Sequence, residues 1–178
     1  EMFLLANNLI LVTAMIMILV GTLYPLVSDV LGLGKVSVGP PYFNFFFVPM
    51  GLALLSFLGL SVSSRWKHTE AAQIYRFSAA PAMLAIFVGG LLPILLAKIY
   101  SSPSYSIGAA LTLICALWVI LVMVQDVIEK LRHRAIFSLS GRYWGMFIAH
   151  CGIAVCAIGI GLSSIYDSQQ DMRMTVGQ

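Results

Sequence analysis

Residues 144–165 read WGMFIAHCGIAVCAIGIGLSSI, a stretch with no Lys, Arg, Asp or Glu and with one histidine, His150. An α-helix rises about 1.5 Å per residue, so roughly 20 residues cross the hydrocarbon core of a bilayer. Lipid offers the backbone no hydrogen bonds, and the backbone must therefore satisfy its own. A stretch of this length and composition is predicted to be a membrane-spanning helix.

The same kind of stretch recurs along the chain. The 178 residues are 60% hydrophobic and 10% charged, with a mean hydropathy of +0.96, which excludes an ordinary soluble domain. No repeat, low-complexity tract or linker divides the sequence. The predicted fold is all-α, a single polytopic transmembrane helix bundle over residues 1–178, with five spans near residues 3–22, 45–62, 77–97, 106–125 and 144–165.

Basic residues are distributed unevenly between these spans. Seven of the ten Lys and Arg residues fall in two loops, at Arg65, Lys67, Arg76, Lys130, Arg132, Arg134 and Arg142. By the positive-inside rule, these two loops face the cytoplasm. The chain is therefore predicted to start on the cytoplasmic side and to end outside, with segment 23–44 as its main external loop.

The predicted external loop is rich in glycine, proline and aromatic residues. Val36 and Val38, followed by Pro40 and Pro41, favour an extended strand or a turn at the membrane surface. Two roles remain open for this loop on the residues alone, an interfacial cap on the bundle and a surface that faces a ligand.

His150 is an ionisable group about two helical turns inside the last span. An imidazole in lipid costs free energy unless it is paired, so such a residue is a candidate functional site. With 3.6 residues per turn, a stripe of small residues beside it is predicted to pack against a neighbouring helix: Ala149, Gly152, Cys156, Gly159 and Ser163. His150 lies at the edge of this stripe, flanked by Met146, Phe147, Ile153, Ala154 and Ala157.

Two interpretations of His150 remain open at this point. Neutral imidazole is a common axial ligand of haem iron, and its other ring nitrogen then bonds a carbonyl or hydroxyl. Alternatively, His150 is a core histidine bonded to a backbone carbonyl or to a Ser or Thr. His68 and His133 sit in the basic loops and are expected to be solvated, so a second histidine ligand would come from outside this chain.

Other chemistry is not indicated. The three cysteines, Cys115, Cys151 and Cys156, all fall inside apolar spans and are predicted to be small buried packing residues. The sequence offers no nucleophile with an adjacent base, no paired carboxylates and no phosphate-binding glycine loop. No catalytic residue is predicted.

Four motifs in order resemble one family. They are residues 4–9 (LLANNL), 21–26 (GTLYPL), 33–44 (LGKVSVGPPYFN) and 141–152 (GRYWGM followed by AHCG). They are similar to the later transmembrane part of the cytochrome c maturation haem lyase CcmF, whose family includes the nitrite-reductase-associated lyase NrfE. The resemblance runs over essentially the whole chain.

The resemblance implies a function that the residues by themselves do not. It implies part of a lyase that attaches haem to apocytochrome c, in a bacterial inner membrane or the equivalent mitochondrial membrane. It also implies an intramembrane b haem that reduces the incoming haem, with His150 as one axial ligand and an earlier helix supplying the other. The family's tryptophan-rich external platform has no counterpart here, because Trp66, Trp118 and Trp144 are isolated. The chain by itself is therefore not expected to be active.

The resemblance also implies a set of partners. They are the remainder of the lyase, a haem chaperone, the proteins that present apocytochrome c, apocytochrome c itself and membrane lipid, with quinol left open and nucleic acid not expected. Two functions of other classes remain: a cofactor-free structural subunit of a membrane complex, and part of a transporter. The transporter hypothesis has weak support from three residues that predict a kink in the third span: Gly89, Gly90 and Pro93.

Overall fold

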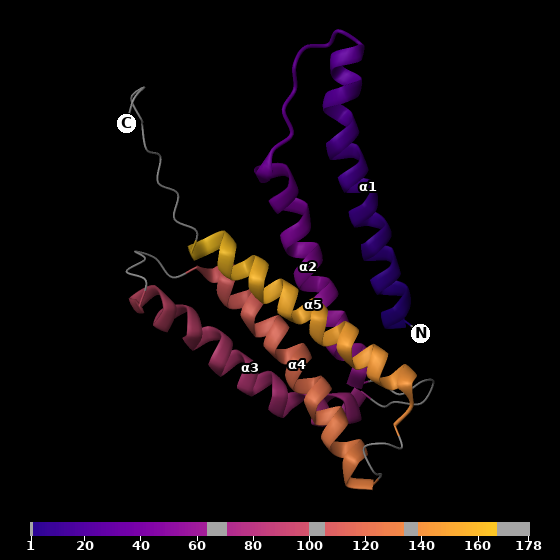
Figure 1. The fold of residues 1–178 in the computed structure, drawn as a ribbon, viewed down its shortest axis with the longest axis vertical. Coiled ribbons are helices and arrows are strands. Elements are labelled where there is room, and N and C mark those ends of the chain that lie inside the picture. Colours follow the sequence, from indigo (N-terminus) through magenta and orange to yellow (C-terminus); the bar gives the residue numbers. More distant parts are fainter. Residues whose placement is uncertain (1, 64–70, 100–105, 134–138, 167–178) are drawn as a thin grey trace, which may run out of the picture.

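The computed structural model describes residues 2–63, 71–99, 106–133 and 139–166. Within these ranges the chain forms five α-helices and no strand (Figure 1), and each helix is long and apolar enough to cross a membrane. The helices are α1 (Met2–Val30), α2 (Pro40–Ser63), α3 (Ala71–Ile99), α4 (Ile107–His133) and α5 (Gly141–Tyr166). The prediction of an all-α polytopic membrane bundle is confirmed, and the chain is an integral membrane protein.

The first connection is shorter than the sequence predicted. Helix α1 continues through Pro25 to Val30, and α2 already begins at Pro40, where a proline needs no backbone donor. The connection is thereby reduced to residues 31–39, which contain a turn but no strand. In lipid, an extended helix keeps its backbone hydrogen bonds paired, whereas a loop leaves some of them unpaired. Helix is therefore favoured over loop in the residues next to each span.

A local set of hydrogen bonds ends α1. Gly32 and Gly34 adopt left-handed backbone angles, with φ of 65° and 101°. The Leu33 amide donates to the Ser28 carbonyl, and the buried Ser28 hydroxyl donates to the Gly34 carbonyl over 3.0 Å. The first bond satisfies a carbonyl that the helix end leaves unpaired, and the second folds the turn back onto α1.

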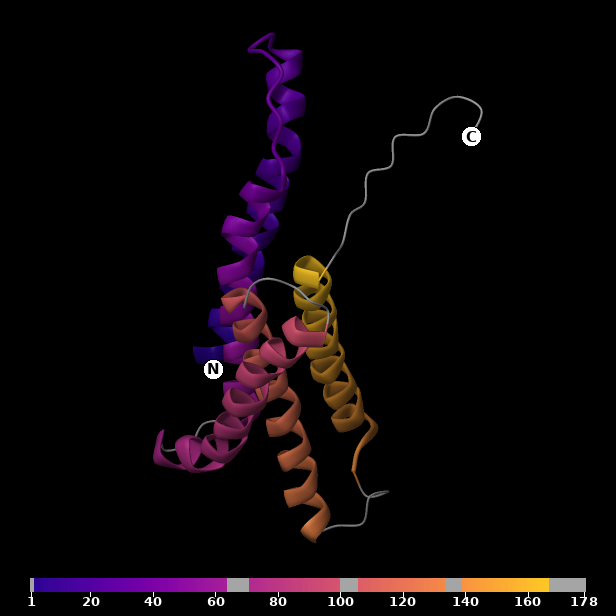
Figure 2. The ribbon, with the colours of Figure 1, turned by 90° about the vertical axis from the view of Figure 1, so that its left-hand side faces the viewer.

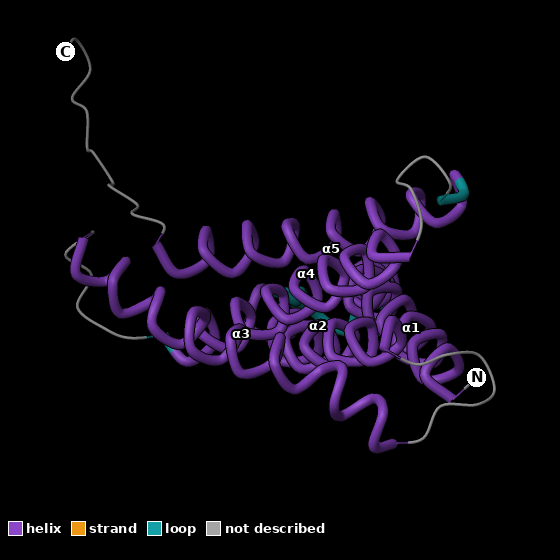
Figure 3. Tube along the Cα trace, turned by 90° about the horizontal axis from the view of Figure 1, so that it is seen from below, coloured by secondary structure: helices purple, strands orange, loops and turns teal. Residues whose placement is uncertain are grey.

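Helix α4 is the centre of the bundle. Helices α2, α3 and α5 pack against it, whereas α1 packs mainly against α2. In the view from below in Figure 3, α5 lies on one side of α4, with α2 and α3 on the other. The central core cluster consists of Leu55, Leu58, Ala116, Val119, Met123 and Ala154. Three of these six residues come from α4, so this helix sets the position of α5 and of His150.

Glycines let the other helices approach α4 closely. A Cβ atom added at Gly89 of α3 would lie 2.8 Å from the Ile114 amide nitrogen. A Cβ at Gly161 of α5 would lie 3.0 Å from the Thr112 methyl group, close to the other end of α5 from His150. Helix α3 also contains Pro81 and Pro93, and Figure 2 shows it bent, as helices with internal prolines commonly are.

Candidate functional site

One ring nitrogen of His150 is bonded within its own helix. The Nδ1 atom lies 2.9 Å from the Met146 carbonyl oxygen, one turn earlier in α5. A carbonyl can only accept, so Nδ1 carries the proton. In the neutral ring the other nitrogen, Nε2, then has a lone pair, and no group in the described part of the chain bonds it. This geometry suits a ring that presents Nε2 to a metal, and it also suits a histidine satisfied by its own helix.

The packed side of α5 differs from the one that the sequence predicted. The α5 residues in contact with the core are Phe147, Cys151, Ala154, Ala157 and Ile158, and Ala154 is 0% exposed. The predicted small-residue stripe lies on the opposite side, and all of its members are exposed: Ala149, Gly152, Cys156, Gly159 and Ser163. A Cβ atom at Gly152 or Gly159 would meet nothing within 4 Å. The prediction that this stripe packs against a neighbouring helix is therefore wrong for the described chain.

His150 lies at the rim of the packed side. It precedes Ala154 by four residues, which at about 100° per residue places the two roughly 40° apart around α5. The side chain of His150 is correspondingly half-buried. It points neither into the tightly packed core nor straight out toward lipid.

The residues predicted to flank His150 fall into two groups. Phe147, Ala154 and Ala157 pack toward the core, so the space beside the fully buried Ala154 is already filled. Met146 and Ile153 are exposed, at 36% and 43%. Ala154 and Ala157 therefore leave no open apolar surface beside the ring. The open apolar surface next to the ring is on the side of Met146 and Ile153.

Among the described residues, His150 does not belong to a cluster of candidate metal ligands. His68 and the side chain of His133 lie outside the described residues. In the ranges that the structure covers, no three His, Cys, Asp or Glu side chains come together as a metal site. Cys115 and Cys151 are partly buried, as predicted for packing residues, whereas Cys156 is exposed and the prediction of burial is wrong there.

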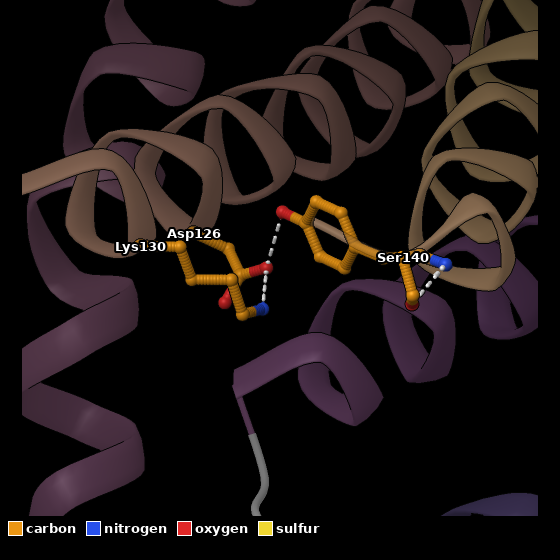
Figure 4. Close-up of polar contacts among 4 residues, drawn as sticks. Asp126, Lys130 and Ser140 are labelled. Carbon is orange, nitrogen blue, oxygen red and sulfur yellow. Dashed lines mark hydrogen bonds and ion pairs between the residues drawn. The ribbon is translucent and has the colours of Figure 1, made fainter. Parts of the chain in front are cut away.

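A polar cluster that the sequence analysis did not identify joins α4 to the start of α5. The Tyr143 hydroxyl donates to Asp126 Oδ2 over 2.8 Å, and Lys130 forms an ion pair with the same carboxylate oxygen (Figure 4). The Lys130 ammonium also lies 4.2 Å from the centroid of the Tyr143 ring. The i, i+4 spacing of Asp126 and Lys130 is a readable signal for an ion pair. The partnership with Tyr143 depends on how α5 docks and has no sequence signal.

Ser140 caps the start of α5. Its side-chain oxygen accepts a hydrogen bond from the Tyr143 amide over 3.3 Å (Figure 4), and its carbonyl accepts another from the same amide over 2.9 Å. Serine at this position satisfies donors that a helix start leaves unpaired. The cap and the hydroxyl bond to Asp126 thus meet at one residue, Tyr143, two turns before His150.

Comparison with known proteins identifies the family. The chain is 40% identical to the cytochrome c-type biogenesis protein CcmF of Pseudomonas fluorescens, over 100% of the chain and 27% of that protein. It is 42% identical to CcmF of Pseudomonas aeruginosa, over 99% of the chain and 27% of that protein. Over its whole length, the chain corresponds to a segment of CcmF-type proteins.

A third CcmF, from Escherichia coli, is 34% identical over 99% of the chain and 26% of its own length. The chain thus spans about a quarter of the length of the CcmF proteins that it matches. Relatives named NrfE and CycK match at lower identity than the Pseudomonas CcmF proteins. No family model and no solved structure matches the chain.

Proposed function

We propose that this chain is the part of a CcmF-type haem lyase that supplies one axial ligand, His150, to a b haem inside the membrane. The names of the relatives support a role in cytochrome c biogenesis. The observation that carries the ligand assignment is the hydrogen bond from His150 Nδ1 to the Met146 carbonyl. Ligating histidines commonly use their second ring nitrogen in this way.

The residues around His150 fit such a group. The Nδ1 bond fixes both the ring tautomer and the ring orientation, and it directs the Nε2 lone pair away from the helix backbone. The exposed Met146 and Ile153 supply apolar surface beside the ring, which keeps water away from a bound macrocycle. When bound, the b haem would supply one-electron reduction of the haem that is to be attached.

In this role the chain would hold and orient the haem, and none of its side chains would react. His150 would hold the iron, and we propose that a histidine from the remainder of the lyase would provide its second protein ligand. Phe147 and Ala154 anchor the ligand helix in the core on either side of His150. The further partners in this proposal are a haem chaperone, apocytochrome c and the proteins that present it, with quinol open as the electron source.

The orientation of the chain belongs to the same proposal. The end of α2, the start of α3, the end of α4 and the start of α5 lie at one end of the bundle (Figure 1). These ends flank both of the basic loops, and we propose that this end faces the cytoplasm. His150 then lies in the half of the membrane nearer the cytoplasm.

Replacement of His150 by alanine in the complete lyase tests the function. The expected result is a protein that inserts and accumulates normally but loses the b-type absorption in a pyridine haemochrome assay, together with cytochrome c maturation in cells. Added imidazole is expected to restore part of the absorption, because it can enter the space left by the ring. Val155→Ala is a matched control, since Val155 is 61% exposed on the same helix and lies far from the His150 side.

The alternative functions give different results in this experiment. If His150→Ala retains its haem and its reduced spectrum, His150 is a satisfied histidine of a structural subunit, and the proposal is wrong. A transporter site would require broken helices near the membrane centre, and the described α1 to α5 run as continuous helices.

A further inference from the structure

We propose that Tyr143 is a positioning residue for His150: its hydrogen bond to Asp126 of α4 sets the rotation of α5 about its axis, and so the direction in which His150 presents Nε2. This inference rests on the proposed function, because it assumes that His150 has a ligand to face. Tyr143 itself touches neither the ring nor the haem in this proposal.

The positions of the two residues on α5 support the link. His150 follows Tyr143 by seven residues, which is about two turns and about 10 Å along the helix axis. Seven residues at about 100° each return to within roughly 20° of the starting direction, so both side chains leave α5 on the same side. A rotation of α5 that moves the Tyr143 hydroxyl away from Asp126 therefore turns His150 by the same angle.

The other contacts of α5 constrain this rotation less. Phe147 and Ala154 pack against the core through apolar surface, which is non-directional and tolerates small rotations. Gly161 fixes the distance between α5 and α4 near the other end, through its close contact with Thr112. The bond from Tyr143 to Asp126, at 2.8 Å, is directional and acts at the end of a long, rigid side chain. It is therefore the contact on α5 that is most sensitive to rotation.

The ion pair makes the bond strong and also makes it testable. The side chain of Asp126 is 17% exposed and forms an ion pair with Lys130, and a hydrogen bond to a carboxylate is stronger than one to a neutral acceptor. Lys130 lies over the Tyr143 ring as well, and this less directional contact with the ring remains if the hydroxyl is removed. Tyr143→Phe would leave Asp126 paired with Lys130, and no buried charge would be left without a partner.

The decisive variant is Tyr143→Phe in the complete lyase. We expect normal accumulation, a retention of haem during purification that falls about tenfold or more, as for losing one hydrogen bond to a charged group, and shifted low-spin g-values in the oxidised EPR spectrum. Asp126→Leu is expected to reproduce both changes. Asp126→Asn keeps an acceptor for the hydroxyl and is expected to restore most of the wild-type signal. Tyr75→Phe is the control, because Tyr75 is 74% exposed on α3.

Measuring His150→Ala in parallel separates the two proposals. If His150→Ala keeps its haem, the proposed function fails, and with it any need to position the ring. If His150→Ala loses its haem while Tyr143→Phe and Asp126→Leu keep wild-type retention and g-values, the positioning inference fails and the proposed function stands. If one of the two variants does not accumulate, the other decides, because each removes the same bond from a different helix.

Discussion

Gly89 lies where α3 comes closest to α4, and its replacement by alanine tests that packing. A Cβ atom at this position would lie 2.8 Å from both the amide nitrogen and Cγ1 of Ile114, and 2.9 Å from its Cα. Two of these three atoms belong to the backbone of α4, so they cannot move aside as a flexible side chain could. To reach ordinary contact at 3.4 Å, the helices must separate by about 0.6 Å at this level.

The magnitude follows from two opposing terms. Overpacking of a close contact costs about 1–3 kcal/mol, while alanine gains about 1 kcal/mol over glycine inside a helix. Gly89→Ala should therefore lower the free energy of unfolding by between zero and about 2 kcal/mol. Gly89→Leu brings more atoms against the same backbone and should cost more. Gly51→Ala is the control, because a Cβ at Gly51 of α2 meets nothing within 4 Å.

The assay is thermal or denaturant unfolding of the complete protein in detergent, monitored by the loss of soluble protein and by circular dichroism. The expected order of stability is wild type and Gly51→Ala together, then Gly89→Ala, then Gly89→Leu. Equal midpoints for Gly89→Leu and Gly51→Ala would refute the close approach of α3 to α4. The packing of α3 against α4 would then no longer support a central position of α4 in the bundle.

Two further predictions concern topology and the connection of residues 31–39. Single cysteines introduced at Lys67 and Arg132 are expected to be labelled only from the cytoplasmic side and one at Lys35 only from outside, because most basic residues flank the former positions; external labelling at Lys67 would contradict the orientation. Deletion of Val36 to Val38 is expected to lower cytochrome c maturation in cells, because it shortens the connection of residues 31–39 that Ser28 holds against α1; maturation at the normal level would favour a simple interfacial cap.

The local hydrogen bonds of α5 show how far sequence reasoning reached at the candidate site. A backbone carbonyl was among the hydrogen-bond partners expected for His150 in either role of the ring. An imidazole in lipid needs such a partner close by. The cluster of Asp126, Lys130 and Tyr143 was not expected. Tyr143 and Asp126 are separated by 17 residues and meet because α5 docks on α4 at one particular rotation.

The sequence by itself determined the membrane location, the helical fold and the family. Runs of about 20 apolar residues have one solution in lipid, and the four motifs resemble CcmF in order along the chain. The residues also marked His150, because an ionisable group in an apolar span is rare.

Only the tertiary structure decided which side of α5 is packed. Small residues lie on both sides of this helix, with Ala154, Ala157 and Gly161 toward α4 and the stripe that includes Gly152 and Gly159 facing away. In water, a change from polar to apolar residues marks the buried side of a helix, but in lipid both sides are apolar and that signal is absent. The packed side of α5 is the side on which Phe147, Ile158 and Ala154 fit against the core. That fit places His150 at the rim of the packed side.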